Sequence, residues 1–270
     1  MTDALADIGV IGGTGLTSWL DGAREVPVRT PFGPPSEPPV VGEIAGRRVA
    51  FLPRHGRDHR FPPHHVNYRA NLWALRALGI RQVLAPSAVG SLRHDLGPGA
   101  LVIPDQVIDR TWGRAHTVYD QPGPVVHIPF ADPYCPHGRA TVLATARRAG
   151  WTAPEQATLV VINGPRFSTR AESRWHASTG ADIVGMTGMP EAAIARELAL
   201  CYTNVCLVTD LDAGFEEGDA VTQSEVFTVF GKSVERLKSL LVDTIEALPD
   251  EEDCRCRHAL DGITLPFALP

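Results

Sequence analysis

The sequence lacks any long hydrophobic run: no apolar stretch approaches the roughly 18–20 residues of a membrane-spanning helix. It also lacks an excess of positive charge, since its formal net charge is −6, which argues against a general nucleic-acid binder. Residues 1–7 contain no basic segment followed by an apolar one, so we expect no secretory signal and a cytoplasmic protein. The 270 residues, 44% hydrophobic and 21% charged, have the composition of an ordinary globular protein.

Cysteine is scarce and odd in number. The five cysteines stand at positions 135, 201, 206, 254 and 256. Without a secretory signal, reduced thiols are expected. Only Cys254 and Cys256, with His258 nearby, suggest a metal site. A structural zinc site needs four ligands, usually from two close pairs, and no second pair lies within reach along the sequence. We therefore expect no metal.

Short runs rich in valine and isoleucine alternate with segments of helical periodicity, which predicts an α/β fold. Strands are expected at Ile8–Ile11, Arg48–Leu52, Gln82–Ala85, Leu101–Ile103, Leu159–Ile162, Ile183–Met186 and Val205–Val208. Helices are expected at Tyr68–Leu78, Arg139–Ala149, Thr169–Thr179, Glu191–Leu200 and Ser224–Ala247. Several of the strands are apolar without alternation, as in a parallel or mixed sheet that is covered on both faces. We expect one domain over residues 1–248, then an acidic linker and a docked C-terminal tail over residues 249–270.

Three loops after expected strands carry groups that can hold an anion. The glycine-rich turn at residues 11–15 offers backbone N–H groups and the Thr14 hydroxyl, although a plain tight turn is an equal alternative. The loop with Arg54 and His55 offers a guanidinium suited to phosphate; its alternative is a surface ion-pair cluster. The third, Pro86–Ser91, offers hydroxyls and N–H groups. Because the carboxyl ends of strands meet at one edge of a sheet, we expect these loops to converge on a ligand.

Two further segments follow apolar strands. Phe167, held after a Gly-Pro turn, can stack on a planar ligand or pack in the core. The segment Val205–Asp212 ends in an Asp-x-Asp pair, and the alternation of side chains along a strand places Asp210 and Asp212 on one side. Such acids can accept hydrogen bonds from a ligand or transfer a proton. They can also be solvated or bind Mg²⁺, but no further carboxylate is obviously placed to complete a magnesium site.

Eight motifs, in order from about residue 8 to residue 245, resemble the trimeric purine nucleoside phosphorylases, and in particular the branch that acts on S-methyl-5′-thioadenosine. They are Ile11–Gly15, Leu52–Gly56, Val66–Asn71, Ser87–Ser91, Pro104–Gln106, Gly164–Ser168, Met186–Glu191 and Thr209–Asp212. The resemblance implies a single α/β domain with a central mixed, partly barrel-like sheet flanked by helices, assembled as a homotrimer. It also implies phosphorolysis of S-methyl-5′-thioadenosine to adenine and 5-methylthioribose 1-phosphate, with inorganic phosphate as co-substrate and no cofactor or metal.

By motif match, the resemblance assigns residues to two ends of a site. Those expected to hold phosphate are Thr14, Arg54, His55, Ser87, Ala88 and Thr187. Those expected to hold the nucleoside are Phe167, Val184, Met186, Asp210, Asp212, Val226 and, from a neighbouring subunit, His127. Asp210 would be the catalytic acid at purine N7, and Asp212 would face the 6-amino group. Phe167 would flank the purine and Met186 the ribose.

The two acids favour adenine, because N7 accepts and the 6-amino group donates. Hypoxanthine would turn O6 toward the carboxylate, and an unpaired buried polar group costs about 1–3 kcal/mol. Four departures from the family pattern keep alternatives open. Asn163 replaces an expected Glu, Val184-Gly185 stands where an Asn is common, and residues 213–217 differ from the usual sequence after the acid pair. Most relevant, Gln223 falls where an apolar residue is expected at the 5′ pocket. The alternatives are another 5′-modified adenosine (5′-deoxy or 5′-halo), a free 5′-hydroxyl, a 6-oxopurine nucleoside, or a non-catalytic nucleoside-binding protein.

Overall fold

Ten strands form one mixed sheet in the computed structural model, which describes residues 4–13, 20–213, 221–250 and 253–270. The strands are β1 (Ile8–Gly12), β2 (Asp21–Glu25), β3 (Val40–Ile44), β4 (Arg47–Pro53), β5 (Gln82–Ser91), β6 (Leu101–Val102), β7 (Gln106–Arg110), β8 (Thr158–Ile162), β9 (Ile183–Gly185) and β10 (Cys201–Leu211). Their order is β2-β3-β4-β1-β5-β9-β8-β7, and β10 pairs with both β5 and β6. The pairs of β1 with β4 and β5, and of β10 with β5, are parallel.

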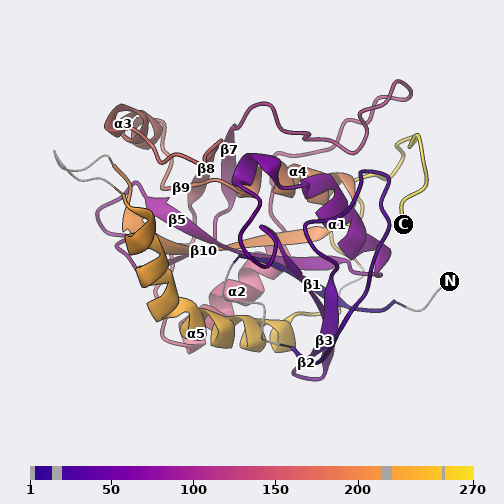
Figure 1. Cartoon of the computed structure of the whole chain (residues 1–270), viewed down its shortest axis with the longest axis horizontal. Coiled ribbons are helices and arrows are strands. Elements are labelled where there is room, and N and C mark those ends of the chain that lie inside the picture. Colours follow the sequence, from indigo (N-terminus) through magenta and orange to yellow (C-terminus); the bar gives the residue numbers. More distant parts are fainter. Residues whose placement is uncertain (1–3, 14–19, 214–220, 251–252) are drawn as a thin grey trace.

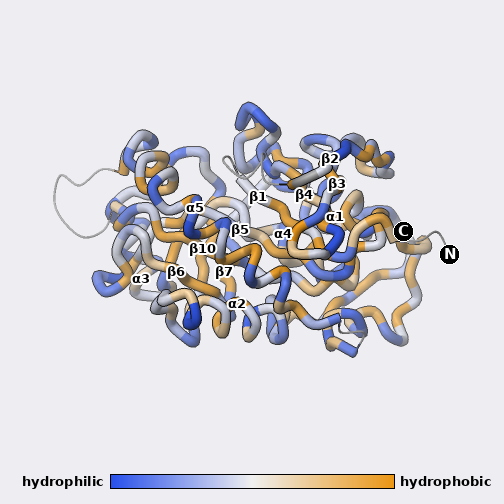
Figure 2. The backbone as a smooth tube through the Cα atoms, turned by 90° about the horizontal axis from the view of Figure 1, so that it is seen from below, coloured by the Kyte–Doolittle hydropathy of each residue, from blue (hydrophilic) through white to orange (hydrophobic). Residues whose placement is uncertain are grey.

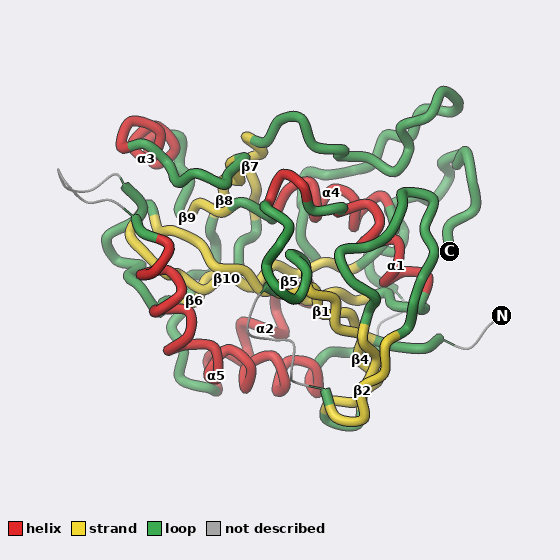
Figure 3. The backbone as a smooth tube through the Cα atoms, viewed as in Figure 1, coloured by secondary structure: helices red, strands yellow, loops and turns green. Residues whose placement is uncertain are grey.

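Helices cover both faces of the sheet (Figures 1 and 3). They are α1 (Tyr68–Ala77), α2 (Pro136–Arg148), α3 (Arg170–Ser178), α4 (Gly188–Glu197) and α5 (Gln223–Ala247), with a short 3₁₀ turn at Pro63–His65. α1 and α4 pack into one hydrophobic core, and α2 and α5 pack into the other. Along β1, Ile8 and Val10 enter the second core and Ile11 the first, as the alternation of a strand requires. Figure 2 shows hydrophobic strands inside and hydrophilic turns outside.

All seven expected strands and all five expected helices are present, and the α/β class is confirmed. A capping box fixes the start of α5: Thr222 Oγ1 accepts from the Glu225 N–H, and Glu225 accepts from the Thr222 N–H. The sequence did not predict β2, β3 and β7. β2 and β7 are the edge strands of the sheet order, and β2 is polar, so neither has an uninterrupted apolar run. No helix in the described ranges has the length and apolarity to cross a membrane.

The prediction that β5 ends at Ala85 is wrong, because the strand continues to Ser91. The expected Pro86–Ser91 loop is therefore strand, stabilised by parallel pairing with β10 along its whole length. β10 likewise continues to Leu211, with an irregularity in register between Val208 and Asp210. On its other edge β5 pairs with β1 only at Gln82–Leu84 and with β9 only at Gly90–Ser91. The intervening part of β5 thus faces a gap between two diverging strands.

Candidate functional site

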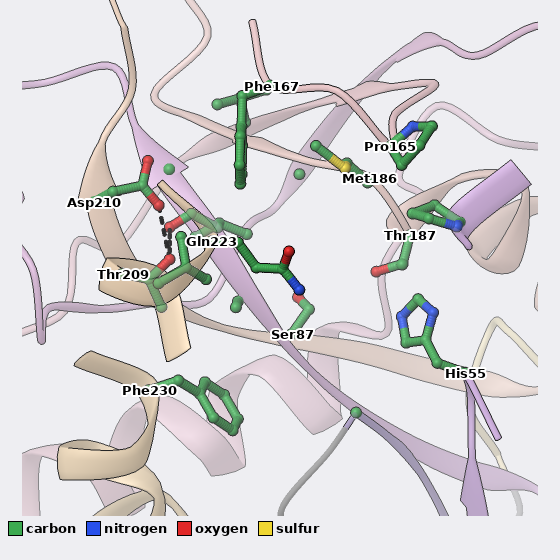
Figure 4. Close-up of a pocket in the computed structure, with 18 of the residues that line it drawn as sticks. His55, Ser87, Pro165, Phe167, Met186, Thr187, Thr209, Asp210, Gln223 and Phe230 are labelled. Atoms are coloured by element: carbon green, nitrogen blue, oxygen red, sulfur yellow. Dashed lines mark hydrogen bonds between the residues drawn. The ribbon is translucent and has the colours of Figure 1, made fainter. Parts of the chain in front are cut away.

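A cavity of about 530 Å³ occupies this gap in the sheet. Residues 86–90 of β5 form one wall, and the ends of β1, β4, β9 and β10 supply Gly13, Arg54, Met186 and Asp210. The loop before α3 and the first turns of α5 close it. A gap between strands of one sheet is where α/β folds bind ligands, because neighbouring loops diverge there. In Figure 4, Asp210 and Phe167 lie on one side of the cavity, and His55 and Thr187 lie on the other.

The structure brings eleven of the predicted site residues together in this cavity. They are Arg54, His55, Ser87, Ala88, Phe167, Val184, Met186, Thr187, Asp210, Asp212 and Val226. Thr14 lies outside the described residues. His127 is exposed and does not line the cavity of its own chain. It belongs to the segment between β7 and α2, which leads away from α3 in Figure 1, so its contribution to a neighbouring subunit stays a prediction.

Asp210 forms the acidic end of the cavity. Its Oδ2 accepts a hydrogen bond from Thr209 Oγ1 at 2.8 Å, drawn as a dashed line in Figure 4. Burial raises the pKa of Asp210 to about 6; the Thr209 bond opposes this rise, and the negative charge of Asp212 adds to it. A Cβ on Gly90 would stand 2.8 Å from Asp210 Oδ1. Glycine at position 90 therefore lets the carboxyl group lie directly against β5.

Asp212 lies beside Asp210 and is almost fully buried, at 3% exposure. Its Oδ2 accepts a hydrogen bond from Ser173 Oγ at 2.5 Å, and its backbone N–H donates to Ser91 O. Ser173 stands on α3, whose start is fixed by a capping box between Thr169 and Glu172. The sequence reasoning missed Ser173, because nothing in the helical pattern marks one serine as facing an acid. The two acids are thus confirmed as neighbours, which the Asp-x-Asp spacing predicted.

Arg54 lies at the bottom of the opposite end of the cavity. Its side chain is 1% exposed, so the alternative of a surface ion-pair cluster is wrong. Its Nε and Nη2 donate to both oxygens of Glu191 at 2.7 and 2.8 Å. Nη2 also donates to Ile11 O, and Nη1 donates to Pro86 O. Since a guanidinium has five N–H groups, these bonds leave one free to meet a ligand. Glu191, which also accepts from Tyr202, holds the guanidinium in place, and the sequence did not single it out.

His55 is held as a neutral ring. Its Nδ1 lies 2.8 Å from Phe61 O, and because a carbonyl can only accept, Nδ1 carries the proton and Nε2 is an acceptor. Burial, and then the positive charge of Arg54, lowers the pKa of His55 to about 3. The ring stacks on His59, with centroids 4.4 Å apart. His55 therefore offers the cavity an acceptor rather than a second cation at neutral pH.

Two hydroxyls complete this end. Thr187 lies just before α4, whose regular turns begin only after the extended residue Met189; its side chain makes no capping hydrogen bond, and Figure 4 places it beside His55. Ser87 Oγ accepts from Asn204 Nδ2 at 3.4 Å and lies 3.5 Å from Cys206 Sγ. Because Cys206 Sγ donates to Asn204 Oδ1, the Ser87 proton has only a weak sulfur acceptor, which a bound anion can replace. The combination of one guanidinium N–H and two hydroxyls can bind an anion.

The first turns of α5 line a third part of the cavity. They contribute Val226, Phe227 and Phe230, which are apolar, and Gln223, whose amide enters the cavity in Figure 4. Phe227 is 44% exposed and meets the edge of the His59 ring. The wall is therefore mostly apolar with one polar group, as the sequence around Gln223 predicted.

The cavity offers little to a metal ion. Within the described part of the chain, the one group of three or more metal-ligating side chains is Cys135, Cys201, Cys254 and Cys256, none of which lines the cavity. Asp210 and Asp212 are not joined by a third such ligand among the described residues. The sequence predicts no cysteine metal site, because no second cysteine pair lies close along the chain. The fold, however, brings Cys135 and Cys201 to Cys254 and Cys256.

Comparison with known proteins agrees with this geometry. The profile of the phosphorylase superfamily matches residues 7–246. The chain is 57% identical to a purine nucleoside phosphorylase of Streptomyces coelicolor, over 98% of each chain. It is 52% identical to an S-methyl-5′-thioadenosine phosphorylase of Mycolicibacterium smegmatis, over 97% of this chain and 99% of the relative.

A solved structure is also similar over most of its length. It is a double mutant of the adenosine/methylthioadenosine phosphorylase of Schistosoma mansoni in complex with adenine, with a TM-score of 0.85 and 39% identity. The alignment covers 92% of this chain and 93% of that one. With a profile that spans nearly the whole sheet and relatives above 50% identity at almost full length, the chain belongs to the phosphorylase superfamily.

Proposed function

We propose that this protein cleaves S-methyl-5′-thioadenosine with inorganic phosphate, giving adenine and 5-methylthioribose 1-phosphate. The observation that carries the proposal is the division of one cavity into two ends. A carboxyl group whose pKa is raised to about 6 stands at one end, and a cluster of anion-binding groups stands at the other. The relative from Mycolicibacterium smegmatis, named for this activity, supports the choice of nucleoside.

The anion end would hold phosphate. Arg54 gives its one free N–H, and the hydroxyls of Ser87 and Thr187 donate from two sides. His55 Nε2 accepts from the O–H of hydrogen phosphate, which suits its neutral state. Glu191 keeps the guanidinium fixed and offsets its charge, so phosphate meets a preorganised site. By family match, Thr14 and Ala88 would add donors here.

The acidic end would hold the base. Phe167 lies against the purine plane, and Met186 and Val184 pack on the nucleoside. Asp212, oriented by Ser173, accepts from the 6-amino group of adenine. A 6-oxopurine would turn O6 toward this carboxylate, which is unfavourable by about 1–3 kcal/mol. The name of the Streptomyces coelicolor relative leaves the base open, and Asp212 is the residue that favours adenine here.

The reaction depends on stabilising the charges that develop on the ribose and on the purine. As the C1′–N9 bond lengthens, the ribose becomes cationic and the purine takes the electron pair. A phosphate oxygen forms the new bond to C1′, while protonated Asp210 gives its proton to N7. Hydrogen phosphate loses one proton when the ester forms and adenine gains one, so Asp210 is restored at the end of the cycle. Each step uses this chain's own groups, without a cofactor.

A second candidate substrate is adenosine, and the Gln223 amide favours it. The methylthio group prefers apolar walls, which Val226 and Phe230 provide. A free 5′-hydroxyl would instead be paired by Gln223. The adenosine/methylthioadenosine phosphorylase of Schistosoma mansoni carries both substrates in its name, which supports keeping both.

We also propose a homotrimer in which His127 of one subunit reaches the 5′ pocket of the next. His127 and Phe227 are exposed in the single chain, as residues at a subunit contact would be. Sedimentation should report three chains per particle, whereas a fully active monomer would contradict the assembly.

All five cysteines are free, which suits the reducing cytoplasm, where we place the protein.

A substrate panel at saturating phosphate tests the proposed function. We expect the highest kcat/KM for methylthioadenosine, a lower value for adenosine, and values at least tenfold lower for methylthioinosine and inosine. Inosine as the best substrate would move the protein to the 6-oxopurine phosphorylases. Tight binding without turnover of any nucleoside would identify a binding protein and overturn the proposal.

A further inference from the structure

Four buried cysteines from three distant segments meet at one point of the fold. Cys135 is the N-cap residue of α2, Cys201 begins β10, and Cys254 and Cys256 belong to the C-terminal segment. Each is at most 6% exposed. Their four sulfur atoms all lie within 4.8 Å of one another. Cys206, the fifth cysteine, is also buried but lies outside this group.

The spacing of the sulfurs fits a tetrahedral metal. With zinc–sulfur bonds of about 2.3 Å, the edges of a tetrahedron of four thiolates are about 3.8 Å long. Cys135 Sγ and Cys254 Sγ lie 3.7 Å apart. All four side chains are free thiols in the structure. Small contractions of the longer separations would bring every sulfur to bonding distance of one central ion.

Groups around the cysteines can offset the charge of such a centre. Zinc with four thiolates carries a net charge of −2, since each thiol gives up its proton on binding. The Gly138 N–H at the start of α2 points to Cys135 Sγ at 3.4 Å. Arg196 Nη2 lies 3.8 Å from Cys256 Sγ. A backbone N–H at a helix N-terminus and a guanidinium both stabilise thiolate ligands.

We propose that Cys135, Cys201, Cys254 and Cys256 bind one Zn²⁺ ion in a closed tetrathiolate site. Four protein ligands leave no position open for water or substrate, so the site is structural and takes no part in phosphorolysis. It would join the C-terminal segment to α2 and β10. Buried cysteines can also act as small apolar residues, but four sulfurs pointing at one another beside a guanidinium are not placed as an apolar core requires.

The zinc site would also fix the base of the segment that carries His127. Arg196, beside Cys256, donates to Pro129 O at 3.0 Å and to Asp132 O at 2.7 Å. Arg255, between the two C-terminal ligands, pairs with Asp132 at 2.9 Å. The cysteines and these two arginines thus connect the C-terminal segment to the chain between β7 and α2.

Metal analysis of the full-length wild-type protein, purified without added metal, tests the site directly. Elemental analysis and native mass spectrometry should find one zinc per chain. A mercurial thiol reagent should release that zinc in proportion to the thiols it blocks. Replacement by Co²⁺ should give the thiolate charge-transfer and visible bands of a tetrahedral cobalt site. These measurements need no variant, so a folding defect cannot confuse them.

Matched variants locate the zinc. Cys254→Ser and Cys256→Ser should each lose most of the bound zinc, from one per chain to nearly none. Cys206→Ser, which removes a buried cysteine outside the cluster, should keep it. Zinc-free wild-type protein whose four cysteines are all alkylated without reduction would overturn the proposal. So would peptides joined by disulfides among these four residues, or iron in place of zinc.

Discussion

The nucleoside cavity and the cysteine cluster both gather buried polar groups, but they do so in opposite ways. The cavity combines unlike groups and holds them apart: Asp210 at one end, and Arg54, His55 and Thr187 at the other. The cluster combines four identical groups and holds them together, with every sulfur within 4.8 Å of the others. Groups that stand apart keep hydrogen-bonding capacity for a ligand, whereas groups that converge leave space only for one ion.

Charge compensation differs in the same sense. In the cavity, Glu191 neutralises Arg54 from behind and leaves one N–H facing forward. Burial raises the pKa of Asp210 to about 6, and among the described residues no cation opposes this rise, so its proton is available near neutral pH. In the cluster, Arg196 and a helix N-terminus both support one kind of group. The arrangement in the cavity suits catalysis, and the arrangement in the cysteine cluster suits a structural metal site.

The largest effect is expected from Asp210→Asn, which keeps the size of the side chain and removes its transferable proton. With methylthioadenosine, kcat should fall by about 10²-fold or more, because general acid catalysis typically contributes about 10²–10⁴-fold. Steady-state kinetics measures this, with Asp243→Asn, an exposed acid on α5, as the control. Near-full kcat in Asp210→Asn would remove the general acid from the mechanism.

The same variant should change the pH dependence of both activity and stability. The pKa of Asp210 is raised from 3.8 to about 6, so the folded state binds its proton more tightly than the unfolded chain. The free energy of unfolding of the wild type should therefore decrease as the pH rises from about 4 to about 6, by on the order of 2–3 kcal/mol. Above pH 6 the kcat/KM of the wild type should fall as well. Urea denaturation and pH profiles of Asp210→Asn should lack both changes; their persistence would assign them to another group.

The next largest effect is expected from Glu191→Gln, which leaves the buried Arg54 charge without its partner. Removing one member of a buried ion pair costs about 3–5 kcal/mol of stability. Glu235→Gln, which breaks the exposed pair with Lys238, should cost less than about 1 kcal/mol. Urea denaturation compares the two. Equal small losses would show that Arg54 is satisfied without Glu191.

Asp212→Asn should change base preference more than rate. An amide can donate to O6, so the ratio of kcat/KM for methylthioadenosine to that for methylthioinosine should fall by the equivalent of about 1–3 kcal/mol. Ser173→Ala removes the bond that orients Asp212 and should lower turnover of both nucleosides without reversing the preference. An unchanged ratio in Asp212→Asn would mean that this carboxylate does not face the base.

The smallest effect is expected from Gln223→Leu at the apolar wall. Loss of the amide should favour methylthioadenosine over adenosine by about 1 kcal/mol, or about fivefold in kcat/KM. Val226→Thr, which adds a hydroxyl to the same wall, should act in the opposite direction. A Gln223→Leu variant that turns over adenosine better than before would contradict the role of the amide.

Position near strand ends predicted part of the cavity, including Asp210 and Arg54. The resemblance to known phosphorylases, rather than position, supplied Val184, Met186, Thr187 and Val226. It did not predict that β5 continues through Pro86 to Ser91, because only pairing with β10 makes small polar residues into strand. Glu191 left a weak signal: it is a charged residue among the apolar residues 188–195, and such an acid implies a buried cation. The cysteine cluster left only part of a signal, the close pair Cys254 and Cys256, because Cys135 and Cys201 are brought to that pair by the fold alone.

Phosphate dependence is the most direct test of the central claim, that the two ends of the cavity act together. Adenine release from methylthioadenosine is followed by absorbance, and the products are examined by phosphorus NMR, with and without inorganic phosphate. The account predicts no release without phosphate, and one sugar 1-phosphate formed per adenine when phosphate is present. Equal release without phosphate, giving free 5-methylthioribose, would show a hydrolase and contradict the account.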